Sequence, residues 1–374
     1  MKKVLFLIPS LGGGGAEKVL TTLVNRLCEY NYDITIIVIF GNGIYEKQID
    51  KRVHVKQIFS SRSNSGKMWK YIHIFRNKML CLISGKRLYK WFVRGQYDYE
   101  IAYLEGLSTK IISGSDTDSR KIAWVHVDPE VFGYSKTFYR CEKDEVSAYR
   151  IFDDVFCVSE AVRNSFENKY GIKAKVILNM IDRDDIIKRS YETIIDDVNE
   201  KCLHLVSVGR MSRQKGFERL LKALKKLKEL NYKFDIQILG IGELWADLKN
   251  LSIQYGLEDH IIWRGFQVNP YPYMRSADAF ICSSLTEGYC TAVVESIILS
   301  VPVITTDCAG MREIFGGYQC GRIVDNSEEG IYCGIKEILD NPESLTYMRE
   351  EARRRSQNFD TKSKVDEFIA EALK

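Results

Sequence analysis

The sequence predicts an α/β protein built from two doubly wound, Rossmann-like domains that face each other, with the active site in the cleft between them. Its 374 residues are long for one hydrophobic core. Short apolar runs alternate with stretches of helical spacing in two series, separated by a charged, poorly periodic stretch at 182–201. We therefore expect an N-terminal domain over 1–182, a C-terminal domain over 183–355 and a helix within 356–374 that packs back toward the N-terminal domain.

The first series opens with a continuous apolar run at 4–8, which is typical of a strand covered on both faces of a parallel sheet. A glycine-rich loop over 9–15 follows, then apolar residues at helical spacing and a second strand at 34–40. Further strands of this series are expected at 99–104, 121–126 and 155–158.

The second series repeats the alternation. Its strands are expected at 203–208, 234–239, 260–263, 279–282 and 301–305. Its helices are expected at 217–230, 243–255, 342–359 and 361–373, with one more beginning after Gly288.

Composition places the chain among ordinary proteins, with 45% hydrophobic and 28% charged residues. The apolar run after Lys2 and Lys3 is too short for a signal peptide, and no run is long enough to cross a bilayer. Ten scattered cysteines without a Cys-x-x-Cys motif indicate reduced thiols in a cytosolic protein. Because no two histidines stand at ligand spacing either, we expect no metal.

The loop Gly12–Gly15 invites a dinucleotide-binding interpretation. Glu17 stands where the third glycine of G-x-G-x-x-G belongs, and Phe40 and Gly41, with no acidic residue, end the next strand. NAD binding is therefore disfavoured. The glycines instead indicate a backbone that approaches a ligand closely.

Residues 47–94 carry thirteen Lys or Arg and one acidic residue, Asp50. Apolar residues recur there at helical spacing, among aromatic side chains: Met68, Ile72, Phe75, Met79 and Leu82. A basic amphipathic helix of this kind suits an anionic membrane surface. The alternative is a solvated face over a core stripe, and nucleic acid is disfavoured because no recognisable nucleic-acid-binding module is present.

Two strands of the first series end at candidate site residues. Glu105 follows the strand at 99–104, and His126 ends the next strand. Ligands of open α/β sheets bind at the carboxyl ends of strands, so both residues are expected to face the ligand. The Asp116-Thr117-Asp118 triplet has the form of a metal-binding D-x-D motif, but it precedes a strand and is interpreted as a solvated turn.

The stretch 286–295, read T-E-G-Y-C-T-A-V-V-E, places Glu287 in a loop and Glu295 about two turns into a helix that begins after Gly288. The start of such a helix offers N–H groups to an anion, and the two carboxylates can bind hydroxyls beside it. A sugar, a diphosphate and a ribose have this layout. Arg210 and Lys215 add two positive charges after the first strand of the second series.

Taken together, these motifs resemble the retaining glycosyltransferases of family 4, which have the GT-B fold. The resemblance runs over nearly the whole chain and is strongest from Val206 to Ile314. Cys290 stands where many members have proline. The matching segments are the glycine loop, S-V-G-R-M-S-R-Q-K-G, I-L-N-M-I-D, L-G-I-G-E-L, W-R-G-F-Q and E-G-Y-C-T-A-V-V-E.

The resemblance implies a role for each matching residue. Arg210 and Lys215 would hold the donor diphosphate, Glu295 the ribose and Glu287 the donor sugar. His126 would face the reacting centre. Glu105, predicted from its place at the end of a strand and not from the resemblance, is expected beside the acceptor. The remaining donor contacts would come from Gly14, Gly15, Phe266, Gln267, Gly288, Tyr289, Cys290 and Thr291.

The expected enzyme is a metal-independent retaining hexosyltransferase without a cofactor, since fixed cations stabilise the leaving diphosphate. It would move a hexose or N-acetylhexosamine from a nucleotide sugar, with uridine favoured over guanosine, to a polyprenyl-diphosphate-linked glycan in capsule, exopolysaccharide or other cell-envelope synthesis. It would be cytoplasmic and bacterial, peripheral on the inner face of the cell membrane. The alternatives are a nucleotide-sugar epimerase on the same fold and a non-catalytic glycan- or nucleotide-binding module.

Overall fold

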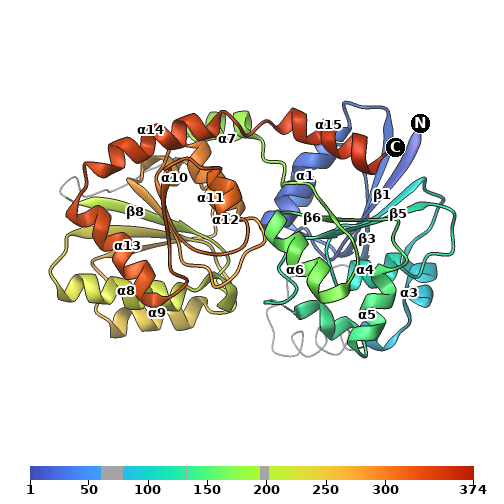
Figure 1. Ribbon diagram of the computed structural model, residues 1–374, viewed down its shortest axis with the longest axis horizontal. Helices are drawn as coiled ribbons and strands as arrows, with labels where there is room; N and C mark the ends of the chain where they lie inside the picture. The colour runs from blue at the N-terminus through green and yellow to red at the C-terminus, as the bar shows by residue number, and fades with distance from the viewer. Residues whose placement is uncertain (60–78, 132, 194–201) are drawn as a thin grey trace. The chain divides into compact units, whose positions relative to one another are not determined.

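The computed structural model describes residues 1–59, 79–131, 133–193 and 202–374, which form two compact units (Figure 1). The N-terminal unit comprises Met1–Met180 together with Lys362–Lys374, and the C-terminal unit comprises Ile181–Thr361. Each unit is a parallel sheet with helices on both faces. The two doubly wound α/β domains expected from the sequence are therefore confirmed.

The N-terminal unit contains a seven-stranded sheet of order β3-β2-β1-β4-β5-β6-β7, in which every pair is parallel. Its strands are β1 (Lys2–Ile8), β2 (Tyr32–Phe40), β3 (His54–Phe59), β4 (Tyr99–Ala102), β5 (Arg120–Val125), β6 (Asp154–Cys157) and β7 (Lys175–Val176). Its helices are α1 (Gly15–Leu27), α3 (Gly85–Phe92), α4 (Leu107–Ile112), α5 (Glu142–Tyr149), α6 (Glu160–Tyr170) and α15 (Thr361–Ala372), with short 3₁₀ helices η1 (Ile44–Gln48) and η2 (Tyr134–Phe138).

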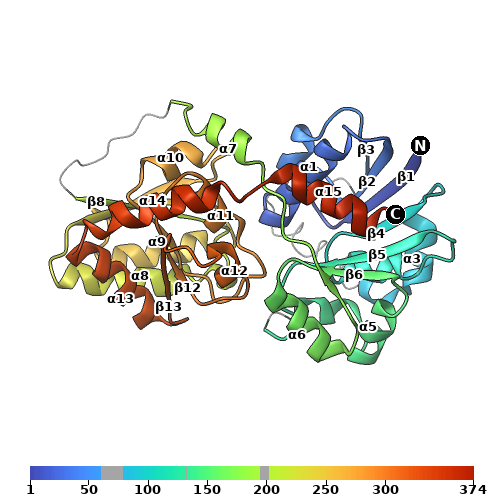
Figure 2. The ribbon, with the colours of Figure 1, turned by 45° about the horizontal axis from the view of Figure 1, so that its top comes forward.

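Helix α15, at the end of the chain, packs on the sheet of the N-terminal unit (Figure 2). Phe368 is fully buried, with its ring centroid 5.3 Å from that of Trp124 and 6.4 Å from that of Phe6. The Tyr30 hydroxyl donates to Asp366 over 2.5 Å on the same helix. Burying an aromatic ring of this size contributes several kcal/mol, so the last helix is an integral part of the first unit's core.

The C-terminal unit contains a six-stranded parallel sheet of order β10-β9-β8-β11-β12-β13. Its strands are β8 (Leu203–Val208), β9 (Phe234–Leu239), β10 (Ile261–Gly265), β11 (Ala279–Cys282), β12 (Val303–Thr306) and β13 (Gly321–Val324). Its helices are α7 (Arg183–Arg189), η3 (Arg213–Lys215), α8 (Phe217–Glu229), α9 (Trp245–Gln254), α10 (Tyr271–Ser276), α11 (Thr291–Ile298), α12 (Met311–Phe315), α13 (Glu328–Asp340) and α14 (Ser344–Ser356).

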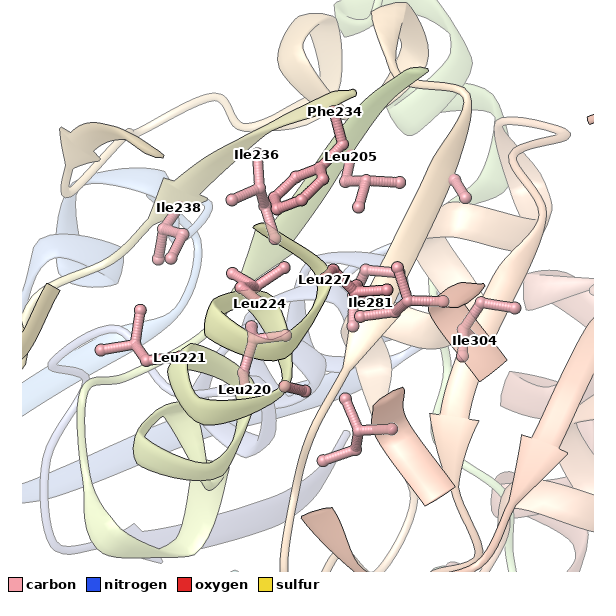
Figure 3. Packing of buried hydrophobic residues seen from close by; sticks show 14 of the residues in the cluster. Leu205, Leu220, Leu221, Leu224, Leu227, Phe234, Ile236, Ile238, Ile281 and Ile304 are labelled. Atoms are coloured by element: carbon pink, nitrogen blue, oxygen red, sulfur yellow. The ribbon is translucent and has the colours of Figure 1, made fainter. Parts of the chain in front are cut away.

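The core of the C-terminal unit forms between its sheet and helix α8 (Figure 3). The helix presents leucines at helical spacing to apolar side chains of four strands, which is why this amphipathic segment lies against the sheet. Helices α8, α9 and α13 cover one face, and α10, α11 and α14 cover the other. The labelled side chains of this core are Leu205, Leu220, Leu221, Leu224, Leu227, Phe234, Ile236, Ile238, Ile281 and Ile304.

Three findings correct the sequence-based organisation. Three strands that form or extend the sheet margins were not expected: β3, β7 and β13. They lack long apolar runs, because strands at a sheet margin are buried less completely. Helix α7 lies within the stretch that was interpreted as an irregular boundary, and the division between units falls before it, between Met180 and Ile181.

Candidate active site

The loops after β8 and β11 meet at the centre of the C-terminal sheet. These two strands are neighbours, yet the chain leaves β8 toward β9 and leaves β11 toward β12, so their carboxyl ends form a topological switch point. Open α/β sheets bind ligands at this position. Arg210 and Lys215 follow β8, and Glu287 follows β11.

Lys215, which is half-buried, and the buried Glu287 form an ion pair at this point. Nζ of Lys215 lies 2.6 Å from Oε1 of Glu287, and Oγ of Ser284 donates to the same oxygen over 2.5 Å. Burial alone lowers the pKa of the Lys215 ammonium, but the nearby Glu287 carboxylate raises it, and the net shift is upward. The site therefore holds a permanent positive charge in partly desolvated surroundings.

The loop that carries Lys215 is fastened to the loop after β11. Gly216 has φ +63°, and a Cβ there would lie 2.1 Å from the carbonyl oxygen of Ser283, so only glycine permits this approach. Oγ of Ser283 donates in return to the carbonyl oxygen of Lys215 over 2.9 Å. Arg219 donates to the carbonyl oxygens of Ser283 and Ser284. These bonds fix the backbone that positions Lys215.

Helix α11 begins at Thr291, with Cys290 as its N-cap residue and no side-chain cap. This corrects the expected helix start after Gly288: Gly288 and Tyr289 belong to the preceding loop, and Glu295 lies about one turn, not two, inside the helix. The carbonyl of Gly288 lies 2.5 Å from the position of a Cβ on Gly310, which has φ +76°. The loop is thus closely packed, because the chain of Gly310 crosses it without a side chain.

The other predicted donor residues of this unit lie along the same sheet edge. Arg210 is exposed directly after β8, and Glu295 is buried on α11. Phe266 and Gln267 follow β10; the Phe266 side chain is exposed, and Gln267 donates to the carbonyl of Arg264 over 2.7 Å. Tyr289 and Cys290 are buried, and Thr291 is half-buried. The structure therefore joins Lys215 directly to Glu287, and the remaining candidates lie in the loops that follow β8, β10 and β11 and at the start of α11.

Two predicted residues of the N-terminal unit are also in contact. The backbone N–H of His126 donates to Oε2 of Glu105 over 3.0 Å. The imidazole is buried against Tyr103 and Trp124, at ring-centroid distances of 4.7 and 5.8 Å. Both ring nitrogens of His126 and the Oε1 atom of Glu105 are buried. None of these three atoms has a hydrogen-bond partner among the described residues.

Burial determines the protonation of this pair. It lowers the pKa of His126 to about 3, so the imidazole is neutral at physiological pH. Burial also raises the pKa of Glu105 to about 7, against the opposing hydrogen bond from the His126 N–H. Glu145 of α5 is fully buried as well, and neither of its carboxylate oxygens has a partner among the described residues. These unsatisfied polar atoms are candidates to meet a polar ligand.

The glycine loop precedes α1 at the carboxyl end of β1, which is the centre of the N-terminal sheet. Gly14 is the N-cap residue of α1 in an extended conformation, Gly15 begins the helix, and Gly13 has φ +123°. Glu17 is buried in the first helical turn. The loop thus leads directly into α1, and its approach to a ligand stays a prediction.

The Asp116–Asp118 triplet and the basic amphipathic segment were two further sequence-based interpretations. Asp116 is exposed and lies 3.5 and 3.6 Å from the ammonium groups of Lys86 and Lys90, which agrees with a solvated turn. The expected amphipathic helix falls mainly on 60–78, outside the described residues. At its described end, the side chains of Met79 and Leu82 are exposed, as is that of Trp91 on α3. In the part of the chain that the structure covers, no helix combines the length and apolar character needed to span a bilayer.

The sequence analysis missed groups that tertiary structure assembles. Among the described residues there are two sets of three side chains that could bind a metal ion. Within each set, the potential ligand atoms lie within 4.8 Å of one another. One set is Cys202, His204 and Asp235; the other is Cys282, Glu287 and Cys290, beside Lys215. The eight positions that separate Cys282 from Cys290 show no metal motif, so spacing alone carried no signal. The expectation of a metal-free enzyme stays a prediction.

Comparison with known proteins gives a family match over part of the chain. Residues 194–355 match the family model described as glycosyl transferases group 1. Over 96% of both chains, the sequence is 25% identical to the N-acetylgalactosamine-N,N'-diacetylbacillosaminyl-diphospho-undecaprenol 4-alpha-N-acetylgalactosaminyltransferase of Campylobacter jejuni. These matched residues make up most of the C-terminal unit, which therefore has the sequence of a group 1 glycosyltransferase domain, and the chain as a whole is similar to a bacterial glycosyltransferase.

The chain is similar to further glycosyltransferases, one of them named for polysaccharide biosynthesis. It is 25% identical to the amylovoran biosynthesis glycosyltransferase AmsD of Erwinia amylovora, over 84% of each chain. The structure of HepE from Anabaena, in complex with UDP and glucose, matches it with a TM-score of 0.73 at 19% identity, covering 100% of this chain and 99% of that chain. This match of fold confirms the expected GT-B architecture of two Rossmann-like domains.

Proposed function

We propose that this glycosyltransferase moves a hexose or N-acetylhexosamine from a UDP-sugar to a lipid-linked oligosaccharide, with retention of the anomeric configuration and without a metal. One observation carries the donor half of the proposal: the Lys215 ammonium lies 2.6 Å from Glu287 at the topological switch point. A cation beside a carboxylate is what a diphosphate joined to a sugar requires. The UDP bound to the structurally similar HepE supports the choice of base.

The reaction places negative charge on the departing phosphate and positive character on the anomeric carbon. An ammonium has three donors, so Lys215 can keep its bond to Glu287 and still donate to the diphosphate. Arg210 follows the same strand and would form a second phosphate contact. The N–H groups at the start of α11 would add further donors. Together these groups stabilise the leaving diphosphate electrostatically.

Glu287 would orient the sugar. Lys215 and Ser284 both donate to Oε1, so we assign Oε2 to a hydroxyl of the donor sugar. Glu295, buried one turn into α11, would accept from the ribose. No side chain here is assigned as a covalent nucleophile. The acceptor hydroxyl would attack from the face that the diphosphate leaves, and a phosphate oxygen would take its proton.

The N-terminal unit would serve the acceptor and the reacting centre. His126 is neutral and has two unpartnered ring nitrogens among the described residues, so it can either donate or accept a hydrogen bond to a sugar hydroxyl. Glu105 holds the backbone of His126 in place. The Campylobacter relative acts, by its name, on a diphospho-undecaprenol substrate, and this supports a polyprenyl-diphosphate-linked acceptor for the present chain.

The decisive experiment incubates the purified enzyme with a panel of UDP- and GDP-sugars and a polyprenyl-diphosphate-linked glycan, with products analysed by mass spectrometry and NMR. With a UDP-sugar we expect a new glycoside that keeps the anomeric configuration of the donor. The yield of this product should be the same with and without EDTA. Loss of activity in EDTA would contradict the proposal that the enzyme works without a metal. Conversion of the nucleotide sugar without acceptor would indicate an epimerase instead, and binding without turnover would indicate a non-catalytic module.

Association with the inner face of the cell membrane is a separate part of the proposal. Residues 47–94 carry a net charge of +12, which suits an anionic bilayer. Flotation with liposomes should recover more protein with anionic lipid than with neutral lipid, and added salt should reduce the difference. Equal recovery with both lipids would contradict membrane binding through this basic segment.

A further inference from the structure

Two cysteines meet beside the Lys215–Glu287 pair. Cys282 is the last residue of β11 and Cys290 is the N-cap residue of α11. Both side chains are buried, with 6% and 3% of their surface exposed. Their sulfur atoms and a carboxylate oxygen of Glu287 all lie within 4.8 Å of one another. No role in the proposed transfer has been assigned to Cys282.

The surroundings distinguish the two sulfur atoms. A hydrogen bond from the Cys290 thiol is the largest influence on Cys282, and it lowers the Cys282 pKa to about 6 with help from Lys215 and Ser284, against the effect of burial. The same bond, together with burial, raises the pKa of Cys290. Cys282 is therefore the more easily deprotonated thiol of the two. Two buried thiols this close together, one of them more readily ionised, have the arrangement of a redox-sensitive pair.

Other buried cysteines of the chain lack this arrangement. Burial raises the pKa of Cys308 to about 12 and that of Cys320 to about 11. Thiols with such values are almost entirely protonated at neutral pH and react slowly. The contrast indicates that geometry, and not burial as such, makes Cys282 reactive.

We propose that Cys282 and Cys290 form a reversible disulfide in response to a hydroperoxide, and that this disulfide weakens binding of the nucleotide-sugar donor. The effect on the donor rests on the proposed function, whereas disulfide formation does not. The pair is a thiol switch built into the loop that carries Glu287.

The chemistry balances with the hydroperoxide as the only oxidant. The Cys282 thiolate attacks the terminal oxygen of ROOH, the O–O bond breaks, and the alkoxide leaving group takes a proton to give ROH and a sulfenic acid. The Cys290 sulfur then attacks the Cys282 sulfur. An S–S bond forms, the S–O bond breaks, and the hydroxide leaves with the thiol proton as water. Two sulfur atoms are oxidised and one peroxide is reduced.

The structural consequence follows from the required bond length. The two sulfur atoms must approach to about 2.05 Å in a disulfide. Cys290 would move toward the end of β11, and the segment between the two cysteines contains Ser284 and Glu287, whose bond to Lys215 sets the donor geometry. This movement would displace the first N–H groups of α11, because Cys290 is the N-cap residue of that helix.

The first experiment treats the reduced full-length protein with graded hydrogen peroxide, blocks remaining thiols and maps peptides by mass spectrometry. We expect a peptide pair joined through Cys282 and Cys290 that disappears after dithiothreitol. In parallel, the affinity for UDP should fall about tenfold or more and recover on reduction. Absence of the linked pair in folded protein would overturn the proposal.

Variants separate this pair from other thiols. Cys282→Ala should form no such disulfide, and its affinity for UDP should be the same before and after peroxide. Cys333→Ser, which alters an exposed cysteine on α13, should respond as the wild type does. An equal loss of UDP affinity in Cys282→Ala would also overturn the proposal. If the linked pair forms but UDP never binds the reduced protein, the proposed function fails and the disulfide assignment stands.

Discussion

The candidate sites of the two units differ in whether their buried polar groups have partners. In the C-terminal unit, the charge of Lys215 is matched by Glu287 at 2.6 Å, and Ser284 completes the arrangement. In the N-terminal unit, Glu105, His126 and Glu145 are buried with oxygen or nitrogen atoms that have no partner among the described residues. A paired site is complete before the ligand arrives, whereas an unpaired site gains its partners from the ligand. The difference predicts distinct responses to mutation and pH.

The largest effect is expected where a buried charge loses its partner. Lys215→Ala should reduce turnover by about 10² to 10³-fold, because it removes a cation that stabilises the leaving group and leaves Glu287 uncompensated. Steady-state kinetics with the UDP-sugar measure the loss. Lys222→Ala, which breaks an exposed pair with Glu218, is the matched control and should retain normal rates. Turnover by Lys215→Ala at the wild-type rate would refute the paired site.

Two glycines with φ +63° test how each unit constrains its backbone. A Cβ on Gly171 in the N-terminal unit meets no atom within 4 Å, whereas one on Gly216 would lie 2.1 Å from the carbonyl oxygen of Ser283. Gly171→Ala should cost about 1 to 2 kcal/mol of unfolding free energy from backbone strain alone. Gly216→Ala should cost about 2 to 4 kcal/mol and weaken UDP binding. Equal destabilisation of both variants in denaturant titrations would contradict this prediction. It would show that the backbone at Ser283 moves enough to accept a Cβ at position 216.

Burial of the Glu105 carboxyl should make the stability of the N-terminal unit depend on pH. Its pKa is raised from 4.5 to about 7, so the folded state binds the extra proton between these values and stability falls as pH rises through this window. Glu105→Gln cannot ionise. Its unfolding free energy relative to wild type should therefore increase between pH 5 and pH 8, by on the order of 1 to 3 kcal/mol. A pH-independent difference between the two proteins would argue that Glu105 titrates normally.

His126 should show the opposite trend. Its pKa is lowered from 6.5 to about 3, so the unfolded state binds more protons between these values and stability falls as pH falls through the window. His126→Gln should therefore gain stability relative to wild type as pH drops from 7 to 5. Melting temperatures at several pH values measure the trend, and a gain in the reverse direction would contradict the burial of a neutral imidazole.

The smallest effect is expected at the surface of the N-terminal unit. Asp116 is half exposed and more than 3 Å from both Lys86 and Lys90. Asp116→Asn should change stability by less than about 1 kcal/mol and leave turnover unaltered, because exposed ion pairs are screened by water and salt. Kinetics with and without added divalent cations provide the check. A large loss of activity would restore the metal-binding interpretation of the Asp116–Asp118 triplet.

Much of the fold was predictable because the central strands of a parallel sheet are continuous apolar runs. β1, β2, β8 and β9 were found where such runs occur. β3 was not, because none of its side chains is fully buried and its sequence shows no apolar run. The start of α11 was misplaced because glycine is compatible with both a turn and a helix start, and packing against Gly310 decides between them.

By itself, the sequence determined the alternation of strands and helices, the glycines that permit close approach, and the residue types of the site, because these depend on local periodicity and on side-chain chemistry. Only the tertiary structure decided which groups meet. Lys215 and Glu287 are 72 positions apart and become an ion pair because β8 and β11 are neighbours in the sheet. The same strand order brings the Cys282 thiol to this pair, and burial, which no local pattern encodes, sets the protonation of Glu105 and His126.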